Sequence, residues 1–108
     1  MVENHAVFAE IAVRQFLASH DVTVVASLAA ARERLPFGFD VVLVDFDLDD
    51  GKGDALVREL VASGFRGRII AISSHDAGNA ALVEAGAHAA CPKARFSELG
   101  GMLSGARS

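Results

Sequence analysis

The feature that most constrains the fold of this chain is an apolar run that ends on an acid. Residues 41–44 read VVLV, and Asp45 follows them directly. A run without polar alternation is typical of a strand buried on both faces, as in a parallel sheet covered by helices. Ligands of such sheets bind at the carboxyl ends of the strands. Asp45 is therefore predicted to lie at the edge where a ligand would bind.

Strand-like and helix-like segments alternate along the chain. Apolar or β-branched runs predict strands over residues 22–26, 40–44, 69–72 and 87–91. Helical spacing of apolar residues, with glycine stops and with Asn4 and Ser27 as caps of the first two helices, predicts helices over residues 6–19, 28–35, 54–63, 79–85 and 97–103. The 108 residues correspond to a single domain, residues 1–108. The alternation implies an α/β fold with a doubly wound parallel sheet and right-handed crossovers.

The composition of the chain limits the kinds of binding partner and the cellular compartment that we expect. Hydrophobic residues make up 52% of the chain, which predicts a densely packed aliphatic core. The formal net charge of −4 leaves no basic face, so nucleic acid and anionic membranes are poor partners. No apolar stretch approaches the roughly 20 residues that a membrane span needs. The single cysteine, Cys91, excludes an internal disulfide, so we expect a soluble protein of the reducing cytoplasm.

The acidic loop that begins at Asp45 is compatible with more than one chemistry. In a calcium-binding EF-hand loop, Asp45, Asp47 and Asp49 would supply alternating ligands. The glycine required at position six of that loop is Asp50 here, and the glutamate required at position twelve is Leu56. A strand rather than a helix also precedes the loop. The sequence therefore argues against an EF-hand.

Two phosphoryl chemistries remain for this loop. In a haloacid-dehalogenase-type phosphatase, Asp45 would be the nucleophile and Asp47 the acid, but Asp49 stands where a threonine is expected and the chain is too short. The other chemistry is a carboxylate that accepts a phosphoryl group from a protein donor. Such a site needs metal-binding carboxylates, a hydroxyl donor and a cation from elsewhere in the chain.

Residues of these kinds recur at spaced positions. Gly53 follows Asp45 by eight residues, and residues 69–76 (IIAISSHD) place Ser73 just after a predicted strand. Residues 85–93 (AGAHAACPK) end on Lys93. An acidic and polar pair, Glu3 and Asn4, precedes the first predicted helix. In this order and spacing, the four motifs resemble the receiver domains of bacterial two-component response regulators. The resemblance covers nearly the whole chain.

The resemblance implies a five-stranded parallel sheet of flavodoxin-like order 2-1-3-4-5. Its first strand would be central but shortened, because only Met1 and Val2 precede Glu3. We expect such a short strand to leave backbone groups of its two neighbours unpaired. A longer amino terminus, or strand exchange with a partner, would fill that gap.

The resemblance also implies a function and its site residues. Asp45 would accept a phosphoryl group from a histidine kinase or a histidine phosphotransfer protein, and the domain would act on an unidentified downstream protein by contact rather than as an enzyme. Lys93 would pair with one phosphoryl oxygen and the Ser73 hydroxyl with another. Mg²⁺ would be the cofactor, with oxygen ligands from Glu3, Asn4, Asp45 and the backbone carbonyl of Asp47.

Several positions depart from the receiver pattern. Asn4 replaces an acid that usually binds the metal, so Mg²⁺ is expected to bind weakly. Ala90 stands where an aromatic residue usually responds to the hydroxyl, Asp49 stands where a proline is common, and the segment from Ser73 to Gly86 is shorter than usual. These departures leave open a pseudo-receiver, an interaction module that works without phosphorylation. The histidines show no metal-ligand spacing, so surface or packing roles are expected for them: His5, His20, His75 and His88.

Overall fold

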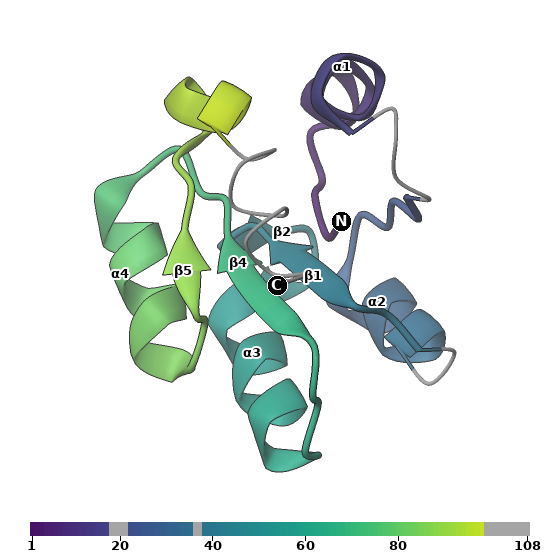
Figure 1. Cartoon of the computed structure of the whole chain (residues 1–108). Helices are drawn as coiled ribbons and strands as arrows, with labels where there is room; N and C mark the ends of the chain where they lie inside the picture. The colour runs from purple at the N-terminus through teal and green to yellow at the C-terminus, as the bar shows by residue number, and fades with distance from the viewer. Residues whose placement is uncertain (18–21, 36–37, 99–108) are drawn as a thin grey trace.

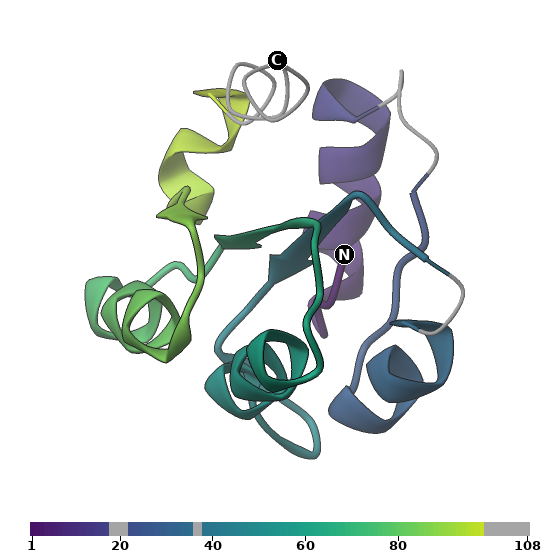
Figure 2. The same ribbon diagram turned by 60° about the horizontal axis from the view of Figure 1, so that its bottom comes forward.

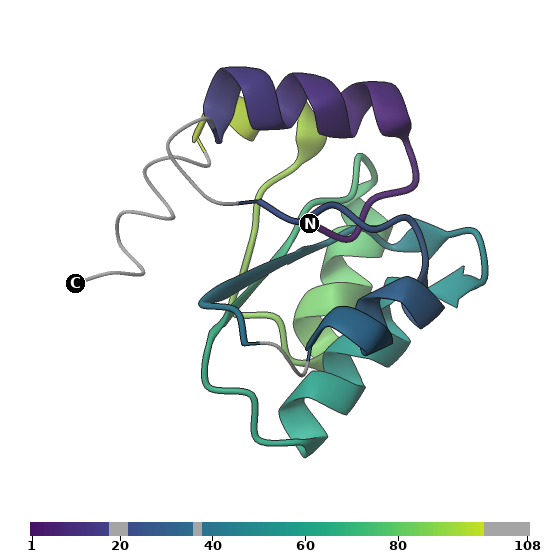
Figure 3. The ribbon, with the colours of Figure 1, turned by 90° about the vertical axis from the view of Figure 1, so that its right-hand side faces the viewer.

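The computed structural model describes residues 1–17, 22–35 and 38–98. A parallel sheet lies between two layers of helices (Figures 1 and 2). One layer holds α1 (Ala6–Phe16) and the 3₁₀ helix η2 (Lys93–Glu98), and the other holds α2 (Leu28–Arg34), α3 (Gly53–Ala62) and α4 (Asp76–Ala85). The three layers are also seen edge-on in Figure 3.

Within the described residues, the regular sheet has three strands, in the order β1-β4-β5. β1 (Val41–Val44) pairs in parallel with β4 (Arg68–Ala71), and β4 pairs in parallel with β5 (Ala89–Ala90). Side chains of β1 alternate between two apolar clusters, since Val42 and Val44 face the α2–α4 layer while Leu43 packs in the cluster below α1 and η2. The prediction of a strand buried on both faces is therefore confirmed.

The expected five-stranded order 2-1-3-4-5 is not confirmed, because only three strands of the described residues form a regular parallel sheet. The first two expected strands are reduced to single parallel bridges, from Val2 to Val25 on one side and from Val2 to Val44 on the other. The amide of Val2 donates to Leu43 O at 2.7 Å, and the amide of Glu3 donates to Val25 O at 2.9 Å. Residues 1–3 thus lie between the two neighbours that the resemblance predicts. They are too few to form a strand of normal length.

Five helices were expected, and four of them are found among the described residues as α-helices with shifted ends. α2 begins after Ser27, whose hydroxyl accepts from the Ala30 amide at 3.1 Å, as predicted. α1 follows His5 rather than Asn4. α4 begins at Asp76, earlier than the predicted residue 79, because one more helical turn forms directly after the loop at Ser73. The predicted helix over residues 97–103 is replaced by η2, and its residues 99–103 lie outside the described part of the chain.

The loop after β1 forms a small hairpin that the sequence did not predict. β2 (Asp47–Leu48) pairs antiparallel with β3 (Gly51–Lys52). Asp50, at the turn, accepts hydrogen bonds from the amides of Leu28 and Ala29 at 2.8 and 3.0 Å, and these bonds lower the pKa of Asp50. The first turn of α2 therefore holds the tip of the acidic loop in place.

The close surroundings of Gly53 explain why a glycine is needed eight residues after Asp45. Its amide donates to Phe46 O at 2.6 Å, and a β-carbon on Gly53 would lie 1.9 Å from the backbone oxygen of Asp45. The start of α3 therefore packs directly against the backbone at the end of β1. No side chain fits between them.

We predict that Gly53→Ala destabilises the fold by about 1 to 3 kcal/mol, since the added methyl group must push α3 away from Asp45. Alanine in a helix normally stabilises relative to glycine, so the sign itself is diagnostic. Urea unfolding measures the change, with Asp54→Ala in the same helical turn as the control. A more stable Gly53→Ala protein would contradict the proposed crowding.

Candidate functional site

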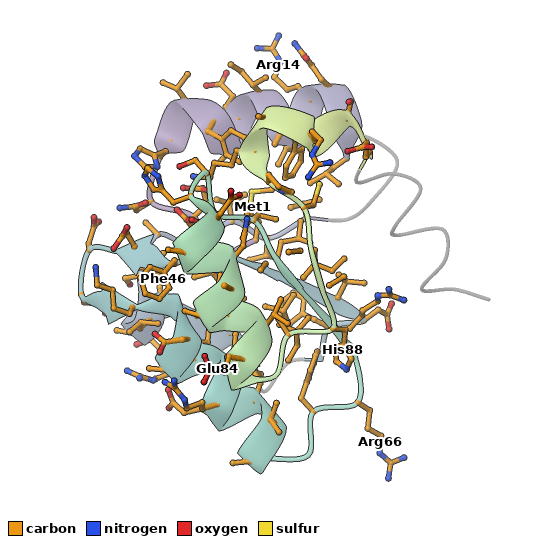
Figure 4. The ribbon with its side chains drawn as sticks, turned by 90° about the vertical axis from the view of Figure 1, so that its left-hand side faces the viewer. Met1, Arg14, Phe46, Arg66, Glu84 and His88 are labelled. Carbon is orange, nitrogen blue, oxygen red and sulfur yellow. The ribbon has the colours of Figure 1, made fainter. Side chains whose placement is uncertain are left out.

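The candidate site lies at the carboxyl edge of the sheet. Asp45 follows β1, Ser73 lies just beyond β4, and Lys93 follows β5. Parallel strands end on the same edge, so residues far apart in sequence meet there. Figure 4 shows this polarity: Phe46, next to Asp45, lies at one end of the sheet, and His88, just before β5, lies at the other.

A buried ion cluster forms the centre of this edge. The ammonium group of Lys93 lies 2.7 Å from Glu3 Oε1 and 3.1 Å from Asp45 Oδ2. Glu3 and Asp45 are only 1% and 4% exposed, and the Lys93 side chain is 12% exposed. Glu3 Oε1 accepts no well-aligned hydrogen bond from the part of the chain that the structure describes, but the short distance makes Lys93 its partner. Buried carboxylates require such partners, because desolvation without compensation is costly.

The remaining contacts of this cluster orient its members. The amide of Phe46 donates to Asp45 Oδ1 at 2.8 Å, so each carboxylate oxygen of Asp45 has a partner. The Lys93 ammonium also lies 4.7 Å from the ring centre of Phe8 on α1. With two carboxylates and one ammonium, the cluster keeps a formal charge of −1, which favours binding of a further cation.

His5 joins this cluster, although its sequence context did not predict a role in the site. Its Nδ1 atom lies 3.2 Å from Glu3 Oε2 and 3.4 Å from the Lys93 ammonium. Potential ligand atoms of Glu3, His5 and Asp45 all lie within 4.8 Å of one another. The interpretation of His5 as a surface or packing residue is therefore incomplete, because its side chain is exposed but reaches the cluster. Its position two residues after Glu3, at the start of a helix, was the available signal.

Asn4 and Asp47 lie at the margin of the site. The Asn4 amide nitrogen donates to Asp49 Oδ1 at 3.2 Å, and its buried Oδ1 has no hydrogen-bond partner among the described residues. The Asp47 carboxylate pairs with Lys52 across the hairpin, which lowers the pKa of Asp47. Its side chain is thus engaged with Lys52 and is absent from the group formed by Glu3, His5 and Asp45.

Ser73 is held by α4 rather than by the ion cluster. Its amide donates to Asn79 Oδ1 at 2.8 Å, and the Asn79 Nδ2 group donates back to Ser73 O at 2.9 Å. The Ser73 hydroxyl accepts from the His75 amide at 3.1 Å. No sequence motif pointed to Asn79, for which the available signal was a polar residue within an otherwise alanine-rich helical segment.

Comparison with solved structures identifies the fold. The receiver domain of a Francisella response regulator superposes with a TM-score of 0.84 at 18% identity, over 95% of this chain and 89% of that one. The signal receiver domain of the putative response regulator NarL from Mycobacterium tuberculosis gives a TM-score of 0.79 at 22% identity, over 98% and 92% of the two chains. The chain has the receiver-domain fold. The resemblance inferred from the sequence is confirmed at this level.

Other comparisons complete this result. A CheY-like receiver domain from Methanospirillum hungatei shares the fold with a TM-score of 0.82 at 16% identity, over 96% of this chain and 87% of that one. Neither protein-family profiles nor curated protein sequences match the chain. Among the described residues, the helices are too short or too polar to cross a bilayer.

We predict that Lys93→Met destabilises the protein by about 3 to 5 kcal/mol at neutral pH, because it leaves Glu3 and Asp45 buried without their cation. Lys52→Met removes the same kind of side chain from an exposed pair with Asp47 and should have little effect. Thermal or urea unfolding of the two variants, side by side, measures the difference. Equal losses would mean that the buried ion pair has no special role in stability.

Proposed function

We propose that this protein is a phosphoryl-accepting receiver of a two-component phosphorelay. Asp45 accepts a phosphoryl group from the phosphohistidine of a histidine kinase or histidine phosphotransfer protein, and the domain then acts on a downstream protein by contact. The observation that supports this most directly is the ion pair between Lys93 and Asp45, placed at the carboxyl end of β1. The receiver-domain fold of similar structures supports a signalling role.

The reaction is a displacement at phosphorus. An Asp45 carboxylate oxygen forms a bond to phosphorus while the bond from phosphorus to the imidazole nitrogen of the donor breaks, and the imidazole leaves with that electron pair. The product is an acyl phosphate on Asp45. Lys93 lies within reach to pair with a phosphoryl oxygen, and the Ser73 hydroxyl, whose oxygen already accepts from His75, keeps its proton to donate to another.

The donor set fits a hard divalent cation such as Mg²⁺. Glu3 and Asp45 present carboxylate oxygens, and the buried amide oxygen of Asn4 lacks a partner among the described residues. When bound, Mg²⁺ would offset the negative charge of the carboxylate and the phosphoryl group. The response regulator Rcp1, which has a similar fold, has been solved in a form with bound Mn²⁺, and this supports a divalent cation here. The backbone carbonyl of Asp47 stays a proposed further ligand.

The test of phosphoryl acceptance is the intact mass after incubation with acetyl phosphate and magnesium. We expect a gain of one phosphoryl group in the wild-type protein and none in Asp45→Asn. Asp49→Asn is the matched control, because it makes the same change in the same loop and should still gain the group. A wild-type protein that gains no mass would point instead to a pseudo-receiver that works without phosphorylation.

We also predict that Asn4→Asp strengthens Mg²⁺ binding by about 1 to 3 kcal/mol, because it adds a charged ligand for a hard cation. The new carboxylate would face Asp49, to which the Asn4 amide now donates, so the variant should be less stable without metal. Calorimetric titration of both proteins with Mg²⁺ measures the difference. Adding Asp49→Asn to this variant should restore the stability of the metal-free protein. Unchanged Mg²⁺ affinity would exclude position 4 from the metal site.

A further inference from the structure

Ser73 and Asn79 form a closed pair of buried hydrogen bonds. The side-chain amide of Asn79 accepts from the Ser73 amide at 2.8 Å and donates to the Ser73 carbonyl at 2.9 Å. Ser73 is 2% exposed and Asn79 is 6% exposed. The Asn79 side chain thus takes the place of a neighbouring strand, because it satisfies both backbone groups of one residue. Water cannot easily replace bonds that are buried in this way.

These bonds attach Ser73 to α4 rather than to the sheet. The preceding residue, Ile72, still donates its amide to Val44 O at 2.9 Å, as a continuation of the pairing between β4 and β1. At Ser73 the sheet partner is replaced by Asn79, in the first turns of α4. The position of the Ser73 backbone is therefore set by the position of α4.

Gly78 allows the start of α4 to approach Ser73 closely. A β-carbon on Gly78 would lie 2.6 Å from the Ser73 hydroxyl oxygen and 3.0 Å from the β-carbon of Phe46. The start of α4 therefore packs directly against Ser73 and against the residue after Asp45. A shift of the Ser73 hydroxyl toward a group on Asp45 would change the contacts that α4 makes with Ser73 and with Phe46.

This chain lacks the aromatic side chain through which receivers usually respond to phosphorylation. Ala90 in β5 stands where the resemblance predicts an aromatic residue, and a methyl group offers no bulky side chain that could change position. The segment between Ser73 and Gly86 is also shorter than usual. The direct attachment of Ser73 to α4 is a physical alternative to that route, and it uses residues that lie in this shortened segment.

We propose that Asn79 is a positioning residue that transmits the state of Asp45 to α4. It holds Ser73 in place for hydrogen bonding to a phosphoryl group, and it moves α4 when Ser73 moves. This inference rests on the proposed function, since it assumes a phosphoryl group on Asp45. The responding surface is the amino-terminal part of α4, and the partner that reads it contacts that helix.

The experiment follows backbone amide signals by NMR as beryllofluoride and magnesium are added as a phosphoryl analogue. In the wild-type protein we expect shifts at Phe46 and Lys93, at Ser73, and across residues 76–81. In Asn79→Leu, which keeps a side chain of similar size but removes both hydrogen bonds, the shifts at Phe46 and Lys93 should persist while those across residues 76–81 are lost.

A second variant separates transmission from simple loosening of the helix. Leu82→Val reduces the packing of α4 in the core without touching Ser73, and it should keep the shifts across residues 76–81. Hydrogen exchange of the Ser73 amide, without any analogue, should accelerate in Asn79→Leu and not in Leu82→Val.

The outcomes distinguish the two proposals. Shifts at Phe46 and Lys93 without a response in wild-type α4 would overturn the role of Asn79 and leave phosphoryl acceptance standing. The role of Asn79 is likewise overturned if Asn79→Leu shows the same shifts as the wild type, or if its Ser73 amide exchanges no faster than in the wild type. A wild-type protein with no shift at Phe46 or Lys93 would overturn phosphoryl acceptance, and transmission along with it.

Discussion

The arrangement of the site depends on one ammonium group between two buried carboxylates. Lys93 approaches Glu3 at 2.7 Å and Asp45 at 3.1 Å, and these residues come from three segments that are far apart in the sequence. Burial of two carboxylates at this depth would be costly without a cation beside them. The same interaction therefore joins the amino terminus to β1 and β5. It also places a positive charge beside Asp45.

Around this centre, two departures from the receiver pattern compensate each other. Asn4 replaces an acid and Asp49 replaces a residue that is usually proline, and the Asn4 amide donates to the Asp49 carboxylate at 3.2 Å. An acid at position 4 would face another acid at that distance. The neutral amide at position 4 thus suits the neighbouring acidic loop, which makes the two changes parts of a single adjustment.

A comparable adjustment is found on the opposite side of the site. The segment after β4 is short, and α4 begins at Asp76. This brings Asn79 close enough to bind both backbone groups of Ser73, with Gly78 packed against its hydroxyl. A longer loop would separate the helix from Ser73. The shortened segment and the alanine at position 90 are consistent with a response that runs through α4.

The sequence by itself determined the elements whose signals are local. The unbroken run at residues 41–44 predicted β1, the Ser27 cap predicted the start of α2, and strand ends located Asp45 and Lys93, whose roles stay predictions. Only the tertiary structure decided how far the strands pair, since Val2 and Val25 form single bridges instead of strands. It also decided that His5 and Asn79 reach the site and that Asp50 accepts hydrogen bonds from the first turn of α2. These contacts join residues distant in sequence or depend on loop length, and hydrophobic periodicity contains no information about either.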